Sequence, residues 1–404
     1  MRVSTASAFD ASIANLQRRQ QQLQDTQQQL TSGKKISQAS DDPTGAARAE
    51  RAMVSIDRVD ANQRALEASR NSMTLSESAL GDSNEILQQV REAMVAAGNA
   101  SYTDTERAGL ATKIAGLRDQ LLTIANRPDG SGGYLFAGQG SSTPPFLDQN
   151  GGVSFTGVPG TIQTGNMDKY PLSVNGQQAW EQAATGNGSY VTADAPNANT
   201  GNPAKGWIDG GRVTDPSLLT GHDYTIQITG TAPAAQSYSV NDTTLGTSVI
   251  SGPYTPGKAI SADGMAFTIS GAPVDGDSFT VAPSTHSLKV FDVLDRAVAD
   301  LKTPLRGQAQ ISQSNSARIR DLDSVMSNLQ NARTQVGEQM NNLDNSESRL
   351  SAIKLYSKSE QSAAEDLDMT QGISNFQNQQ SGYDTALKTY AMVQRMNMFQ
   401  YISG

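Results

Sequence analysis

Apolar residues recur every seven positions towards both ends of this chain, and this spacing constrains its fold more than any other feature. A sustained seven-residue spacing is typical of helices that pack along one face in a coiled coil. The sequence therefore predicts two long helical arms, each of which needs a partner for its apolar face. The repeating positions are Leu16, Leu23 and Leu30, then Val59, Leu66, Met73, Leu80, Leu87 and Met94, and towards the C-terminus Leu322, Leu329, Val336, Leu343 and Leu350.

Start and stop signals divide the first arm into three expected helices. Gly33 suits the position after the last turn of the first helix, in which Ile13 lies three residues before Leu16. Asp42 followed by Pro43 is typical of the cap and first residue of a second helix. The sequence TDTE at 103–106 predicts a capping box for a third helix, which we expect to end before residue 128.

The second arm repeats this character. A short amphipathic segment is expected from Leu288 to Leu301, with Pro304 interrupting it. The long seven-residue repeat follows, and a last helix closes the chain. The apolar residues of that last helix are Ile373, Phe376, Tyr383, Leu387, Tyr390 and Phe399.

The stretch between the arms has a different composition. Residues 141–285 contain 12 of the 15 prolines and 20 of the 36 glycines, residues that break helices. Alternating polar and apolar residues predict short strands at 224–229, 237–240, 265–270 and 278–281, with Asp275-Gly276-Asp277 as a hairpin turn. We expect a small β sandwich or barrel, with 4 basic and 11 acidic residues in this stretch.

These observations predict an α+β fold: a long antiparallel helical bundle or coiled coil built from both arms, with an inserted β-rich domain. The expected domains are a terminal coiled-coil region (1–40 plus 365–404), a helical rod (41–140 plus 286–364) and an outer β-rich domain (141–285). Two unrelated helical bundles flanking a β domain are the alternative.

Chemistry-bearing motifs are sparse in the sequence. Cysteine is absent, which excludes disulfides and thiol chemistry, and the two histidines, His222 and His286, lack the setting of a catalytic base. Asp41 and Asp42 are better explained by a helix start than by a metal pair. The sequence also lacks clustered basic residues and an apolar run long enough to span a bilayer. We therefore expect no enzyme activity, cofactor, metal or nucleic acid, and no membrane insertion.

The ends of the arms carry the most informative surface. Two thin helices bury little core by themselves, and eight glutamines between residues 17 and 29 leave their polar faces uncharged. We expect these helices to become ordered only against other subunits. The predicted interface residues are Ile13, Leu16, Leu23, Leu30, Ile373, Phe376, Tyr383, Leu387, Tyr390 and Phe399.

The arms resemble the bacterial flagellin superfamily. The segment LTSGKKISQASDDPTG at 30–45 is similar to the N-terminal signature of that superfamily, and RTQVGEQMNNL at 333–343 is similar to its C-terminal region. Four further segments resemble the hook-associated branch rather than filament flagellin. They are MRVST at the start, DDP at 41–43, GYLFAG with TPPF at 133–146, and MFQYISG at the end.

The resemblance implies a secreted structural subunit of the extracellular flagellum at the hook–filament junction, exported through the flagellar type III apparatus without a cleaved signal peptide. Implied partners are further copies in a ring, a proximal hook-associated junction protein, flagellin and the filament cap distally, and an export chaperone on the C-terminal helix. Filament flagellin itself is the alternative. A secreted enzyme or carbohydrate-binding module carried by residues 141–285 is a third hypothesis.

Overall fold

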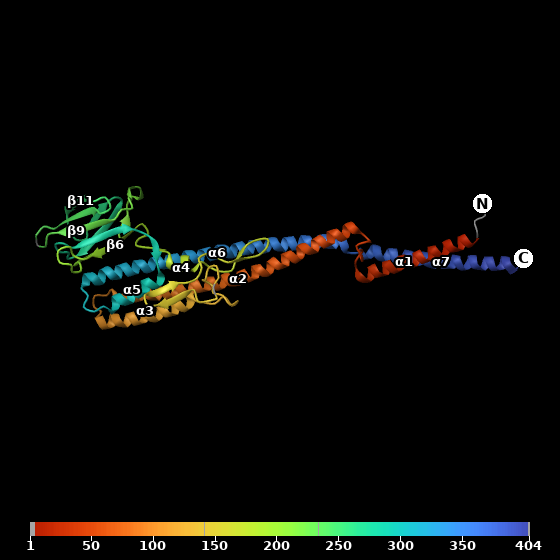
Figure 1. Cartoon of the computed structure of the whole chain (residues 1–404), viewed down its shortest axis with the longest axis horizontal. Coiled ribbons are helices and arrows are strands. Elements are labelled where there is room, and N and C mark those ends of the chain that lie inside the picture. Colours follow the sequence, from red (N-terminus) through yellow and green to blue (C-terminus); the bar gives the residue numbers. More distant parts are fainter. Residues whose placement is uncertain (1–4, 141, 233, 403–404) are drawn as a thin grey trace. The chain divides into compact units, whose positions relative to one another are not determined.

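The computed structural model describes residues 5–140, 142–232 and 234–402 (Figure 1). Of the seven α-helices in this part of the chain, six occupy most of the two arms and one short helix lies in the middle stretch. The expected helix limits agree with the structure: Gly33 takes φ +72° directly after the first helix, and Thr103 forms a capping box with Glu106. The helices are α1 (Thr5–Ser32), α2 (Pro43–Ala97), α3 (Asp104–Ala125), α4 (Gly176–Glu181), α5 (Val290–Lys302), α6 (Gln308–Glu365) and α7 (Met369–Ile402).

The chain divides into two compact units, and the division falls within α2 and α6. One unit comprises residues 1–64 and 346–404, and the other comprises residues 65–345. Each long helix thus contributes a segment to each unit. The three predicted domains are drawn on other boundaries and stay a prediction.

The seven-residue repeat is buried in both α2 and α6. Every predicted repeat position of the two helices, from Val59 to Met94 and from Leu322 to Leu350, is at most 3% exposed. Polar pairs flank this core in the second unit. Arg70 pairs with Asp344 at 2.7 Å and Arg91 with Asp323 at 2.6 Å, so the residue numbers of the partners run in opposite directions. The predicted antiparallel pairing of the arms is confirmed.

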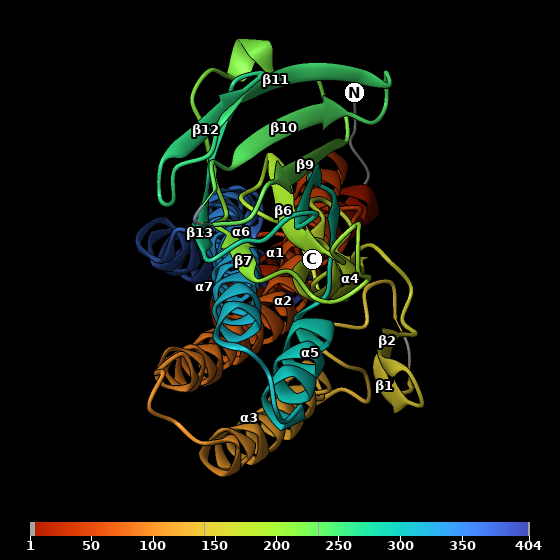
Figure 2. The same ribbon diagram turned by 90° about the vertical axis from the view of Figure 1, so that its left-hand side faces the viewer.

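Helices α3 and α5 lie side by side in the second unit (Figure 2). One expectation for this region is wrong: Leu288 does not begin the amphipathic helix but closes strand β15, and α5 starts two residues later. Three short strand pairs also belong to the second unit. They are β1 (Phe146–Gln149) with β2 (Gly152–Phe155), β3 (Gln163–Thr164) with β4 (Tyr170–Pro171), and β5 (Ala183–Ala184) with β15 (His286–Leu288).

A two-sheet sandwich makes up the rest of the middle stretch. One sheet has the order β11-β10-β9-β14-β6, and the other has the order β12-β13-β7 with β8 also paired to β13. All pairs are antiparallel. The strands are β6 (Tyr190–Ala195), β7 (Gly206–Ile208), β8 (Arg212–Val213), β9 (Tyr224–Thr229), β10 (Ser237–Asp242), β11 (Thr247–Pro253), β12 (Ala259–Ala262), β13 (Met265–Gly271) and β14 (Ser278–Pro283).

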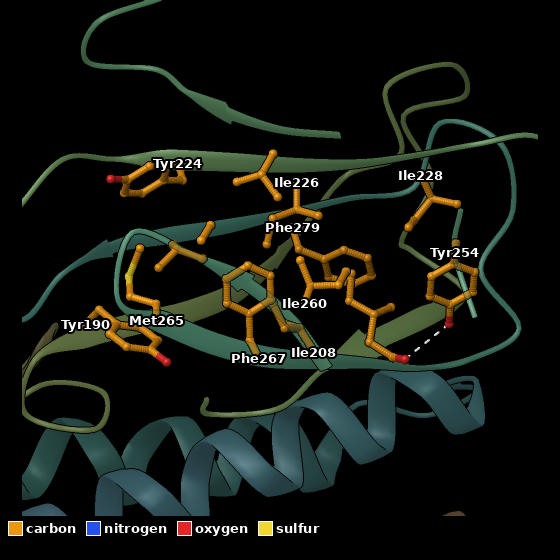
Figure 3. Packing of buried hydrophobic residues seen from close by; sticks show 14 of the residues in the cluster. Tyr190, Ile208, Tyr224, Ile226, Ile228, Tyr254, Ile260, Met265, Phe267 and Phe279 are labelled. Atoms are coloured by element: carbon orange, nitrogen blue, oxygen red, sulfur yellow. Dashed lines mark hydrogen bonds between the residues drawn. The ribbon is translucent and has the colours of Figure 1, made fainter. Parts of the chain in front are cut away.

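Apolar side chains from both sheets meet in one core (Figure 3). Ile226 and Phe279 come from the first sheet, and Phe267 and Ile269 from the second, all at most 1% exposed. Tyr254 donates a hydrogen bond of 3.1 Å to the carbonyl of Ile269 within this core. The predicted strands are therefore confirmed, and of the two expected architectures the sandwich is the one present.

The turn at 275–277 is not the expected hairpin, because β13 and β14 belong to different sheets. Asp277 is fully buried at this crossing and accepts hydrogen bonds from the backbone amides of Lys205 (2.9 Å) and Val274 (3.1 Å). The Asn197 side-chain amide donates to it at 2.7 Å. A buried carboxylate satisfied by several donors fixes the passage of the chain from one sheet to the other.

Candidate assembly interface

Helices α1 and α7 pack against each other in the first unit, where Figure 1 shows them side by side. Thr26 is 7% exposed, and its hydroxyl lies 2.7 Å from Gln379 Oε1. Gly372 leaves room for a close approach, since a Cβ atom there would lie 3.0 Å from Leu30 Cδ2. One polar bond and one close apolar contact thus fix the register of the two helices.

A short antiparallel bridge between Lys34 and Asp366 joins the segment that follows α1 to the segment that precedes α7. We call this bridge the clasp. The amide of Lys35 donates to the carbonyl of Glu365 at 2.7 Å, and the amide of Leu367 donates to the carbonyl of Gly33 at 2.9 Å. The Lys34 ammonium lies 2.6 Å from the Glu365 carboxylate, and this contact raises the pKa of Lys34. The two connections are therefore joined by backbone and side chain alike.

The predicted interface residues lie mainly along these two helices. Ile13, Leu16, Leu23 and Leu30 on α1 are half-buried, and so are Phe376, Tyr383 and Tyr390 on α7. Leu16 and Tyr390 line one groove between the helices, with Gly382 and Arg19 beside them. The side chain of Phe399 lies outside the described residues, and so do residues 1–4 and 403–404, which belong to the two terminal motifs. The assignment of these ten residues to a subunit interface stays a prediction.

Several large apolar side chains of the first unit face outward. On α7, Ile373 is 48% and Leu387 41% exposed, and Met392 reaches 65%. On α6, Leu355 and Tyr356 are 73% and 67% exposed. The sequence analysis did not single out Leu355, Tyr356 or Met392, because they fall between the seven-residue positions. Large apolar residues at positions where the repeat predicts polar ones were the signal that could have identified them.

Other candidate groups serve local structure. His222 Nδ1 lies 2.6 Å from Asp242 Oδ2; burial alone would raise the pKa of Asp242, but bonds from the Leu245 amide and His222 lower it. Asp42 accepts bonds from the amides of Thr44 (3.1 Å) and Gly45 (3.0 Å) and so caps α2 as expected. Among described residues, no cluster of acidic and histidine side chains is arranged to hold a metal ion, and no described helix is long and apolar enough to cross a membrane.

An aromatic cluster beside α5 was also missed by the sequence analysis. Trp180 on α4 stacks on Phe291 with ring centroids 5.8 Å apart and contacts Phe136 and Phe146 at 5.5 and 5.8 Å. Ser69 and Ser72 on α2 donate to the carbonyls of Pro171 and Leu172. The segment around 170–184 is thus packed against the helices and not within the sandwich.

Two family models match this chain. The bacterial flagellin N-terminal helical region matches residues 3–141, and the D2-like domain of flagellar hook-associated protein 1 matches residues 197–283. The second match falls on the sandwich, a region for which the resemblance to the flagellin superfamily implied nothing specific.

Relatives of the hook-associated type match along the whole chain. Flagellar hook-associated protein 3 of Salmonella typhimurium is 25% identical over 413 residues, covering 99% of each chain. Flagellin of Bacillus subtilis is 35% identical over 124 residues, covering 28% of this chain and 38% of the relative.

Among solved structures, FlgL of Xanthomonas campestris matches with a TM-score of 0.69 and 28% identity, covering 78% of this chain and 99% of that one. The hook-associated protein 3 of Legionella pneumophila has a TM-score of 0.71 at 23% identity, covering 77% and 97%. The predicted α+β fold and the resemblance to the flagellin superfamily are confirmed.

Proposed function

Since this chain is similar over its whole length to flagellar hook-associated protein 3 and carries the flagellin N-terminal helical region, we propose that it joins hook to filament as a junction adaptor onto which flagellin polymerises. In this proposal the chain is a structural protein of the extracellular flagellum. The observation that supports a junction role is coverage. The hook-associated relative aligns with 99% of the chain, whereas the flagellins of Shigella flexneri and B. subtilis align with 65% and 28% of it.

The terminal helices supply the proposed contacts. In this proposal, residues 1–40 and 365–404 order on assembly, residues 41–140 and 286–364 form the rod, and residues 141–285 face outward. The exposed Ile373 and Leu387, with the predicted interface residues of α1, pack on neighbouring copies in a ring. Burial of such side chains on association is favourable by about 25 cal/mol per Å² of apolar surface.

Four further partners complete the proposal: a proximal hook-associated junction protein, flagellin and the filament cap distally, and an export chaperone that covers the C-terminal helix before assembly. The half-buried Phe376, Tyr383 and Tyr390 are the residues such a chaperone would shelter. Aromatic side chains of this kind commonly dominate the energetics of protein interfaces.

A gene deletion with complementation tests the proposal. Cells without this protein should build hooks but release flagellin unpolymerised into the medium. The full-length gene should restore filaments, whereas a variant lacking residues 375–404 should be a folded monomer that does not. Filaments on the deletion strain would contradict the junction role, and so would long filaments grown from the purified protein alone, which would support the filament-flagellin alternative.

A further inference from the structure

A pocket of about 160 Å³ lies in the second unit between α6 and the segment 161–179. Five side-chain amides line it and make no hydrogen bond with any described residue; we call it the amide pocket. They are Gln163, Gln178, Asn331, Gln335 and Gln339. Three of them, Asn331, Gln335 and Gln339, follow one another at four-residue spacing along α6 and therefore share one helix face.

The chemistry of this lining selects for a neutral ligand rich in hydrogen-bonding groups. None of the residues that line the pocket is charged. Each free amide offers a carbonyl acceptor and an NH₂ donor, so it can bond to a hydroxyl group in both directions. An anion or a cation would find no counter-charge here, whereas a ligand with several hydroxyl groups would find a partner for each.

The size and floor of the pocket indicate a single ring. Met73, Ala332 and Val336 lie at its base, and each is at most 7% exposed. An apolar cavity of about 150 Å³ is known to hold a six-membered ring, whereas pockets for drug-sized ligands span about 300–1,000 Å³. An apolar floor with polar walls suits a ring that has a C–H face and hydroxyl groups at its edge.

The far wall of the pocket is held in place without any ligand. Asn328 Nδ2 donates to the carbonyls of Gln178 (2.9 Å) and Ala179 (2.8 Å), which ties this wall to α6. The Ser173 hydroxyl donates to the carbonyl of Gly138 at 2.5 Å and accepts from the amide of Ile162 at 2.9 Å. A preformed site loses little entropy on binding, which favours even a small ligand.

We propose that the amide pocket binds one neutral pyranose unit, either a free sugar or a residue of a glycan. An extended peptide is the other neutral ligand rich in hydrogen bonds, but peptides usually need a sheet edge or a long groove. The proposal is independent of the junction role, because the pocket lies outside the predicted assembly interface.

Titration of the full-length protein with small neutral pyranoses tests this. The probes are methyl α-D-mannopyranoside, methyl β-D-glucopyranoside and N-acetylglucosamine. Calorimetry and saturation-transfer NMR measure their binding. We expect saturable binding of at least one probe at millimolar concentration. Asn331→Ala combined with Gln335→Ala should weaken it about tenfold, since each lost hydrogen bond removes about 0.5–1.5 kcal/mol.

The matched control is Asn341→Ala, which removes an exposed amide of the same helix outside the pocket and should leave binding unchanged. Equal thermal melting of all variants shows that the fold is intact. Three outcomes would overturn the proposal: no saturable binding up to about 50 mM, equal binding by the double variant, or tighter binding of N-acetyl-dialanine methylamide than of every sugar. Filament assembly by the double variant reports on the junction role separately.

Discussion

At the scale of single residues, the cap of α2 shows how one carboxylate makes the stability of the chain depend on pH. The pKa of Asp42 is lowered from its ordinary value of 3.8, chiefly by the hydrogen bond from the Gly45 amide and then by that from the Thr44 hydroxyl. Because the pKa is lower in the folded state, the charge stabilises the fold above the ordinary value. This contribution is lost as the pH falls through the folded-state pKa.

Asp42→Asn isolates the charge, since asparagine is an equally good capping residue. We expect the variant to melt below the wild type at pH 6, and the difference to shrink as the pH falls below 3.8. Calorimetric melting at a series of pH values measures it. Asp57→Asn removes a charge from the same helix away from its cap and should have a smaller effect; a constant difference for Asp42→Asn at all pH values would contradict this account.

At the scale of elements, Arg118 joins α3, α5 and strand β1. Its guanidinium lies 2.6 Å from Asp148 and 2.6 Å from Asp295, and it holds the pKa of Asp148 below the ordinary value, mainly through their hydrogen bond. The Arg118 side chain is 11% exposed, whereas the two carboxylates are 43% and 38% exposed. Water therefore screens part of the attraction.

Arg118→Met should lower the free energy of unfolding by about 1–3 kcal/mol, less than the 3–5 kcal/mol of a fully buried pair, because the carboxylates are partly solvated. The matched variant Arg91→Met breaks a pair with Asp323 whose side chains are 39% and 50% exposed. It should cost about 0–1 kcal/mol. Urea unfolding measures both, and equal losses would show that Arg118 contributes no more than a surface pair.

The helix limits and the buried helix faces could be predicted from the sequence, whereas contacts between distant elements could not. Helix limits follow from local signals, so Gly33, Asp42 and Thr103 identified them, and the seven-residue repeat identified the buried faces of α2 and α6. The crossing at Asp277 and the stacking of Trp180 on Phe291 depend on residues far apart in the chain. The amide pocket was missed for the same reason: its two walls are 149 residues apart even at Ala179 and Asn328.

At the scale of the whole molecule, the chain passes from the helical part into the sandwich and returns from it at one place. The amide of Thr185 donates to the carbonyl of Thr285 at 2.8 Å, beside the pairing of β5 with β15. Deleting residues 187–283 leaves Thr185, Gly186, Ser284 and Thr285 as a four-residue connection between these strands, a length common in hairpins.

We expect this deletion variant to keep its helical circular dichroism and a cooperative melting transition. Arg320 and Gln313 lose partners in the sandwich, Thr192 and Ile208, so a modest drop in melting temperature should follow. Substitution of these two side chains in the full-length chain measures that part of the loss separately. A collapse of the helical signal on deletion would show that the sandwich is needed for the helices to fold.

The clasp limits how the terminal helices can bend. Two separate connections would act as two hinges, and each helix could swing on its own. With the amides of Lys35 and Leu367 bonded across the gap, the two hinges share one axis, so α1 and α7 must tilt together or break both bonds. If the chain assembles as proposed, each copy would adjust its terminal helices to its neighbours through this one coupled motion.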